Sequence, residues 1–132
     1  MSAANLIRKY HEAWTQRDMS TARSCLADDL DFQGSIDTFS SADEFIATLT
    51  GFAQMLTRVD LLQEFYTDDA AALLYDCVTN SPAGSIRTAE FFWLRNGKIA
   101  TIRLVFDATV LRQAMSGKQR ASRPLWSGCN AG

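Results

Sequence analysis

The chain has 132 residues, of which 47% are hydrophobic and 21% are charged, which suits one folded domain and excludes a disordered chain. The formal net charge of −2 argues against nucleic-acid binding, because phosphate contacts need clustered Lys and Arg. No apolar run reaches the roughly 20 residues of a membrane span, and the N-terminus lacks a signal-peptide pattern, so we expect a cytoplasmic protein.

Charge divides the chain into two parts. Residues 1–115 carry ten Lys and Arg and all fifteen acids, a net charge of −5, whereas residues 116–132 carry three basic residues and no acid, a net charge of +3. We therefore expect one domain over residues 1–115 and a basic, flexible tail over residues 116–132. With three widely spaced Cys, a single His and no nucleotide or flavin motif, the sequence predicts neither a metal site nor a cofactor.

The first third of the chain is mainly helical in pattern. Residues 3–17 are predicted to form a helix, because apolar residues recur at a helical period at Leu6, Ile7, Tyr10, Ala13 and Trp14. A second short helix, capped by Asp18 or Ser20, is expected to run to Ala27. An alternating segment over residues 30–34 favours a short strand. Ser41 and Glu44 match a capping box, and the helix that they open is expected to keep one apolar face as far as Leu56.

After this helix the period changes to that of strands. Turn signals separate four expected strands at about 57–66, 71–80, 85–95 and 98–106, and such short connections require antiparallel neighbours. Asp107 is expected to cap a closing helix that turns Val110, Leu111 and Ala114 inward. Helices followed by a meander predict an α+β fold, in which helices pack on one face of a curved antiparallel sheet and a cavity lies between them.

Two carboxylates stand among apolar neighbours in the expected strands, Asp76 and Glu90. A hairpin centred near Pro82-Ala83-Gly84 places them opposite each other on one face of the sheet. Two carboxylates in an apolar cleft cannot both ionise at low cost, so one is expected to keep its proton at neutral pH, an arrangement used in general acid–base catalysis. The alternative is that one or both point to solvent.

The side on which Arg103 lies depends on the last hairpin. A two-residue turn at Asn96-Gly97 would place Arg103 opposite Glu90 and would ion-pair the acids. A three-residue loop with a bulge would instead place Ile102, Leu104 and Phe106 on the Glu90 face and turn Arg103 outward. We favour the second register because it gives the cavity a mostly apolar wall.

The opposite face of the sheet is then rich in aromatic side chains. It is expected to carry Tyr75, Cys77, Ala89, Phe91, Trp93 and Val105, edged by Arg87, Arg95 and Arg103. A monomer seldom exposes so large an apolar patch, so we expect a homodimer through the face that holds Tyr75, Phe91, Trp93 and Val105. Alternatively, a helix or the tail covers this face.

Three segments carry a resemblance to a known family: residues 6–14 (LIRKYHEAW), residues 26–32 (LADDLDF), and Gly97-Lys98-Ile99 followed by Val105-Phe106-Asp107. In order and spacing, residues 3–115 resemble the nuclear transport factor 2-like superfamily, and within it the SnoaL-like (polyketide cyclase or ketosteroid isomerase-like) domains. The resemblance implies a cystatin-like cone with an apolar pocket, often dimeric through the outer face of the sheet. Its members include isomerases, cyclases, hydrolases, dehydratases and non-catalytic binders, so fold does not settle function.

The resemblance also implies roles for single residues. Glu90 lies within one residue of the protonated acid in the oxyanion hole of ketosteroid isomerases. Tyr10 matches the first-helix tyrosine that donates to that oxyanion, and Trp14 would line the same wall. Asp76 matches a pocket carboxylate of limonene epoxide hydrolases.

Other positions depart from both relatives. The catalytic base of ketosteroid isomerases falls near Gly34, which has no side chain, and the arginine and second aspartate of the epoxide hydrolases fall on Leu74 and Leu104. Neither mechanism is therefore expected to apply as a whole.

Together these observations predict a pocket for a small apolar or aromatic molecule that bears a carbonyl or hydroxyl group. The expected lining residues are Trp14, Phe32, Leu74, Ile102, Leu104 and Phe106. If the protein is an enzyme, we expect a cofactor-independent isomerase, cyclase or dehydratase, in which Tyr10 polarises an oxygen and Asp76 or Glu90 moves a proton. The rival hypotheses are a ligand-binding protein without turnover and a dimeric protein-interaction module.

Overall fold

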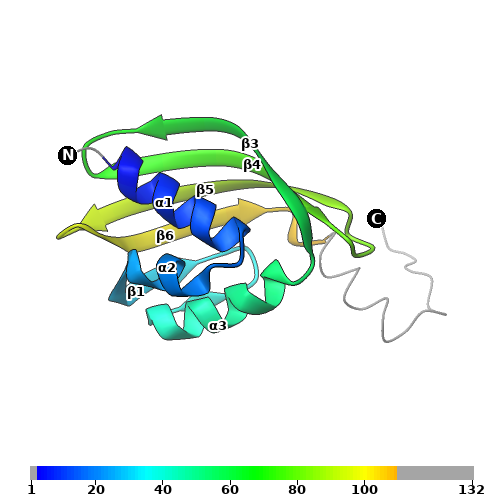
Figure 1. Ribbon diagram of the computed structural model, residues 1–132, viewed down its shortest axis with the longest axis horizontal. Coiled ribbons are helices and arrows are strands. Elements are labelled where there is room, and N and C mark those ends of the chain that lie inside the picture. The colour runs from blue at the N-terminus through cyan, green and yellow to red at the C-terminus, as the bar shows by residue number, and fades with distance from the viewer. Residues whose placement is uncertain (1–2, 110–132) are drawn as a thin grey trace.

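The computed structural model describes residues 3–109, which form three helices and six strands (Figure 1). The helices are α1 (Ala4–Thr15), α2 (Met19–Ser24) and α3 (Ala42–Ala53). The strands are β1 (Leu26–Gln33), β2 (Thr38–Phe39), β3 (Leu56–Tyr66), β4 (Ala70–Thr79), β5 (Ser85–Arg95) and β6 (Lys98–Phe106). The expected closing helix and the 116–132 tail lie outside the described residues.

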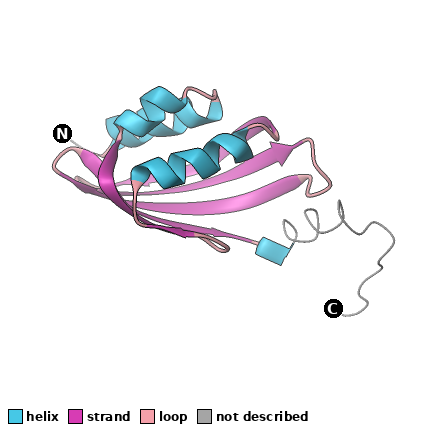
Figure 2. Ribbon diagram, turned by 90° about the horizontal axis from the view of Figure 1, so that it is seen from below, coloured by secondary structure: helices cyan, strands magenta, loops and turns pink. Residues whose placement is uncertain are grey.

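The strands form a single curved sheet in the order β2-β1-β6-β5-β4-β3. All neighbours are antiparallel except β1 and β6, which run parallel. Figure 2 shows the three helices on one face of the sheet, which we call the inner face; the other is the outer face. This arrangement confirms the predicted α+β fold, in which helices pack on a curved, mainly antiparallel sheet.

Helices α2 and α3 begin where the sequence provides caps, whereas α1 follows Ala3 and has no side-chain cap. The Asp18 carboxylate accepts a hydrogen bond from the Thr21 N–H at the start of α2, and the Ser41 hydroxyl accepts one from the Glu44 N–H at the start of α3. The apolar stripe of α1 is buried against the sheet at Ile7, Tyr10, Ala13 and Trp14, as its helical period predicts. Among residues 3–109, no helix is long and apolar enough to cross a membrane.

Helices α2 and α3 both end earlier than predicted. Helix α2 ends at Ser24 rather than near Ala27, because the chain joins the sheet early: the Ile99 N–H of β6 donates to the Cys25 carbonyl at 2.9 Å. Strand β1 therefore begins at Leu26. Helix α3 ends at Ala53, and Leu56 opens β3 instead of closing the helical face.

The register of β4 and β5 corrects the predicted pairing of Asp76 with Glu90. Asp76 lies opposite Arg87, and Glu90 lies opposite Leu73, so the two carboxylates are on opposite faces of the sheet. The connection closes earlier than expected because Thr79 bonds the Gly84 carbonyl through both its N–H, at 2.9 Å, and its hydroxyl, at 2.7 Å. The hairpin is therefore centred between Ser81 and Pro82, and this small shift reverses the face of every side chain in β4.

The β5–β6 hairpin turns Arg103 outward, as we expect, but through a two-residue turn rather than the three-residue loop that we favour. The connection is a two-residue turn in which Asn96 and Gly97 both have positive φ, at 53° and 75°. The register then shifts next to Ala100, so that Glu90 lies opposite Leu104. Leu104 and its alternate neighbours consequently share the inner face with Glu90, while Arg103 turns outward and pairs with Asp31.

Candidate functional site

A cavity of about 560 Å³ lies between the inner face of the sheet and helices α1 and α3. Its lining is mostly apolar and includes eight aromatic rings: Tyr10, Trp14, Phe32, Phe39, Phe45, Phe52, Tyr75 and Phe106. The deep wall is formed by buried residues of α1, β4 and β5. The lining residues Asp37, Thr48 and Gly51 are exposed, so the cavity opens between the 34–37 turn and α3; we call this opening the mouth. A cavity of this size suits a small organic ligand.

Glu90 is the buried carboxyl group of this cavity. It is 2% exposed, and one of its oxygens accepts a hydrogen bond of 2.7 Å from the Tyr75 hydroxyl. Burial raises the pKa of Glu90 to about 7, although the hydrogen bond from Tyr75 opposes the rise. Near neutral pH the protonated and ionised forms of this group are thus similarly populated, so it can both donate and accept a proton.

Tyr10 and Trp14 lie one helical turn apart on α1 and both line the cavity. The pKa of Tyr10 is raised well above its ordinary value, first by burial and then by the negative charge of Glu90, so its phenol stays protonated. Its hydroxyl has no hydrogen-bond partner within residues 3–109, and neither does the buried Nε1 of Trp14. The α1 side of the cavity therefore carries two polar groups that the described part of the chain leaves unpaired.

His11 lies behind the cavity wall. Its ring contacts the rings of Tyr75, at a centroid distance of 5.0 Å, and Trp14, at 5.7 Å, and its Nδ1 is buried without a partner among the described residues. Burial lowers the pKa of His11 to about 4, so the imidazole is neutral at physiological pH. His11 is half-buried and is not among the residues that line the cavity.

Asp76 lies on the other face of the sheet from this chemistry. Its carboxylate accepts two hydrogen bonds of 2.8 Å from the Arg87 guanidinium on the outer face. This ion pair holds the pKa of Asp76 below its usual range. The predicted role of Asp76 in a pocket pair is therefore wrong, and Glu90 has no carboxylate partner opposite it.

The predicted lining set is partly correct. Trp14, Phe32, Leu104 and Phe106 line the cavity. Leu74 is on the outer face because it shares the side of Asp76, and Ile102 is fully buried on the inner face but does not reach the cavity.

Tyr75 and Cys77 are the cavity residues that the sequence analysis placed wrongly. Both were expected on the outer face, yet both are 2% exposed and line the cavity beside Glu90. The charges of Asp76 and Arg87 could have revealed the correct register. Only the observed register places these two residues opposite each other, where they form an ion pair.

Gly34 lies in the cavity wall, as the resemblance places it. A Cβ at this position would come within 3.0 Å of the Phe32 ring, so the close approach of turn and ring favours glycine. Gly34 itself thus cannot supply the base that ketosteroid isomerases carry near this position. Within the described residues, no group of three His, Cys, Asp or Glu side chains could hold a metal ion.

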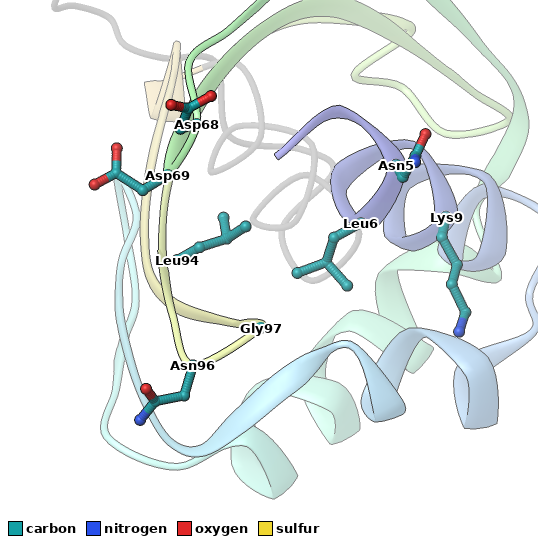
Figure 3. A pocket seen from close by; sticks show the side chains of 8 residues that line it. All are labelled: Asn5, Leu6, Lys9, Asp68, Asp69, Leu94, Asn96 and Gly97. Atoms are coloured by element: carbon teal, nitrogen blue, oxygen red, sulfur yellow. The ribbon is translucent and has the colours of Figure 1, made fainter. Parts of the chain in front are cut away.

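A second hollow of about 410 Å³ lies elsewhere, between the start of α1 and the β3–β4 and β5–β6 turns (Figure 3). Leu6 and Leu94 face each other across it, and its charged residues Lys9, Asp68 and Asp69 are exposed. Because it contains no buried ionisable group, the larger cavity is the better candidate site.

Comparison with known proteins agrees with this architecture. A family model described as a SnoaL-like domain matches residues 7–102. No curated protein matches the chain in sequence.

Solved structures share the fold over most of their length. A protein from Kribbella flavida is 29% identical, with a TM-score of 0.82 over 88% of this chain and 95% of its own. A nuclear transport factor 2-like protein from Cytophaga hutchinsonii is 17% identical, with a TM-score of 0.71 over 85% of this chain and 96% of its own. A candidate ketosteroid isomerase, also from Kribbella flavida, is 13% identical, with a TM-score of 0.66 over 78% of this chain and 76% of its own. The last two likenesses concern the fold alone.

Proposed function

This chain belongs to the SnoaL-like domain family, and we propose that it binds a small, largely apolar carbonyl compound and moves a proton on it through Glu90. The observation that carries this proposal is the Glu90 carboxyl itself, which is buried in the wall of an aromatic cavity and has a pKa of about 7. A carboxyl group with this pKa is suited to general acid–base catalysis without a cofactor.

In the proposed step, ionised Glu90 removes a proton from the carbon next to the carbonyl group. The C–H bond breaks, the proton passes to a Glu90 oxygen, and the electron pair moves onto the carbonyl oxygen. The Tyr10 hydroxyl, which stays protonated, donates to that oxygen and stabilises the enolate. Where the substrate also carries a C=C bond next to that carbon, the enolate extends over it as a dienolate, and return of the proton from Glu90 to the far carbon of that bond completes an isomerisation.

The test uses 2-tetralone, a bicyclic aromatic ketone with acidic C–H groups beside its carbonyl. Proton NMR in D₂O near neutral pH measures how fast these positions take up deuterium. We expect the protein to accelerate exchange, Glu90→Gln to reduce the acceleration about a hundredfold or more, and Tyr10→Phe to reduce it about a hundredfold. Asp76→Asn is the matched control, because it removes a carboxylate from the outer face, and it should exchange like the unaltered protein.

Binding without turnover is the second candidate. The position of Asp76 favours it, because on the outer face Asp76 cannot serve as the partner acid or base of Glu90. If 2-tetralone binds in calorimetry but its exchange rate is unchanged, the protein is a binder and the proton-transfer proposal is wrong.

A further inference from the structure

The charges that line the cavity are all of one sign. Its ionisable residues include two carboxylic acids, Asp37 at the mouth and Glu90 in the deep wall, whereas no Lys, Arg or His lines it in the part of the chain that the structure describes. A ligand with a carboxylate or phosphate would lose its hydration there without gaining a cation. The lining therefore discriminates against anions.

Asp37 is held at the mouth by the turn that joins β1 and β2. The Gly34 N–H donates to the Asp37 carbonyl at 2.7 Å, and the Ser35 hydroxyl accepts from the Phe106 N–H at 3.0 Å. These two bonds fix the turn on the end of β6. Asp37 is thus a lining residue in an ordered position, with an exposed side chain.

Within residues 3–109, no cation compensates the charge of Asp37. Seven other carboxylates form ion pairs with arginines, including the nearby Asp29 and Asp31 of β1. Asp37 forms none with any residue in the range 3–109. An acid at a cavity mouth without its own cation is free to pair with a charge on the ligand.

The aromatic lining and the negative net charge of the chain both favour a positively charged ligand. The Phe39 ring contacts that of Phe32 at a centroid distance of 5.6 Å and lines the cavity near the 34–37 turn, and the faces of such rings attract cations. The whole chain contains thirteen Lys and Arg against fifteen Asp and Glu, a net charge of −2. Such a field raises the local concentration of positive ligands.

From these observations we propose that the carbonyl compound carries a positively charged nitrogen, which lies at the mouth beside Asp37 while the apolar body and the carbonyl group enter the cavity. This inference rests on the proposed function, because it describes the substrate of the same site. It assigns the two acids separate roles: Asp37 selects the substrate, and Glu90 moves the proton. The second oxygen of Glu90 has no hydrogen-bond partner within residues 3–109 and stays available to the reacting end.

The experiment compares three 2-tetralones that differ in one group at carbon 6: trimethylammonium, its neutral isostere tert-butyl, and carboxylate. Calorimetry at low ionic strength measures their affinities. We expect the cation to bind about fivefold more tightly than the neutral compound and the anion about fivefold more weakly, as for an exposed charge pair. Asp37→Asn should remove most of the preference for the cation. Asp68→Asn, which removes an equal exposed charge away from the cavity, should retain it.

The outcomes separate this inference from the proposed function. Equal affinity of all three compounds, or a cation preference that survives in Asp37→Asn, overturns the inference and leaves the Glu90 proposal intact. If the preference depends on Asp37 but the cationic tetralone exchanges no deuterium faster in the presence of the protein, the substrate charge is confirmed and proton transfer is overturned. If none of the compounds binds, both proposals fail.

Discussion

Glu90 shows how burial alone can prepare a carboxyl group for chemistry. No lysine, arginine or histidine side chain contacts it in the described structure, and its one hydrogen bond comes from the neutral Tyr75 hydroxyl. Ionisation of Glu90 is therefore harder in the folded protein than in the unfolded chain. The same property that suits the group to proton transfer makes the protein less stable whenever Glu90 is charged.

Glu90→Gln should remove this dependence on pH. The pKa of Glu90 rises from 4.5 to about 7 on folding, so its contribution is favourable below pH 4.5 and is lost as the pH rises through 7. The loss amounts to about 3 kcal/mol. Urea unfolding at about pH 5 and about pH 8 should show the variant gaining stability relative to the unaltered protein at the higher pH. His11 has the opposite dependence, but it is present in both proteins and cancels in the difference. Parallel stability curves for the two proteins would mean that Glu90 is not desolvated.

The sequence predicts the face on which a side chain lies better for α1 than for the strands of the sheet. The helical period alone puts Tyr10 and Trp14 on the buried stripe, because a shift of one residue along a helix moves a side chain only part of the way round. In a strand the same shift moves a side chain to the other face. Glu90 was assigned to the cavity correctly, whereas Asp76 and Tyr75 exchanged faces.

The wrongly predicted strand register comes from the turn between β4 and β5, whose geometry the sequence does not reveal. The helix caps at Asp18 and Ser41 depend on residues three positions away and were predictable. The bonds from Thr79 to the Gly84 carbonyl, which set the β4–β5 register, are not evident from residue types alone. The parallel pairing of β1 with β6 joins segments about 70 residues apart, which no local pattern specifies.

The Arg17 side chain links the end of α1 to the end of α3 through hydrogen bonds. Its backbone has a φ of 65°, and its guanidinium donates to the carbonyls of Ala53, at 3.0 Å, and Leu56, at 2.9 Å. Arg17→Ala should lose about 2 kcal/mol of stability, because it removes both bonds and keeps the strained backbone. Arg17→Gly should recover about 1 kcal/mol of this loss, because glycine adopts positive φ freely. Urea unfolding measures the order, and a glycine variant no more stable than the alanine variant would exclude backbone strain.

The whole molecule has one face that the described residues leave open. Phe65, Phe91, Trp93 and Val105 are 64%, 39%, 45% and 56% exposed. The strand registers place all four on the outer face of the sheet. Phe65 and Phe91 are aligned across three strands through Ala72. Phe65 thus belongs to the outer-face apolar patch in which the sequence predicts Tyr75. An apolar patch of this kind, bordered by the Arg87–Asp76 and Arg103–Asp31 ion pairs, has the composition of a subunit interface.

We predict that two copies of the chain pair through this outer face. A stable dimer needs about 800 Å² from each partner, which four large apolar side chains and their neighbours on a curved sheet can supply.

Sedimentation velocity at micromolar concentration should show a dimer for the unaltered protein and a monomer for Trp93→Lys combined with Val105→Lys, because lysines at the centre of the patch would be desolvated without partners. Ser20→Lys adds one such positive charge on the helical side, where Ser20 is exposed, and should remain dimeric. A monomeric unaltered protein would exclude the dimer, and a dimer that survives both outer-face lysines would place the interface elsewhere. Since the cavity opens between the 34–37 turn and α3, the monomeric variant should retain 2-tetralone binding, so assembly and the Glu90 site can be tested independently.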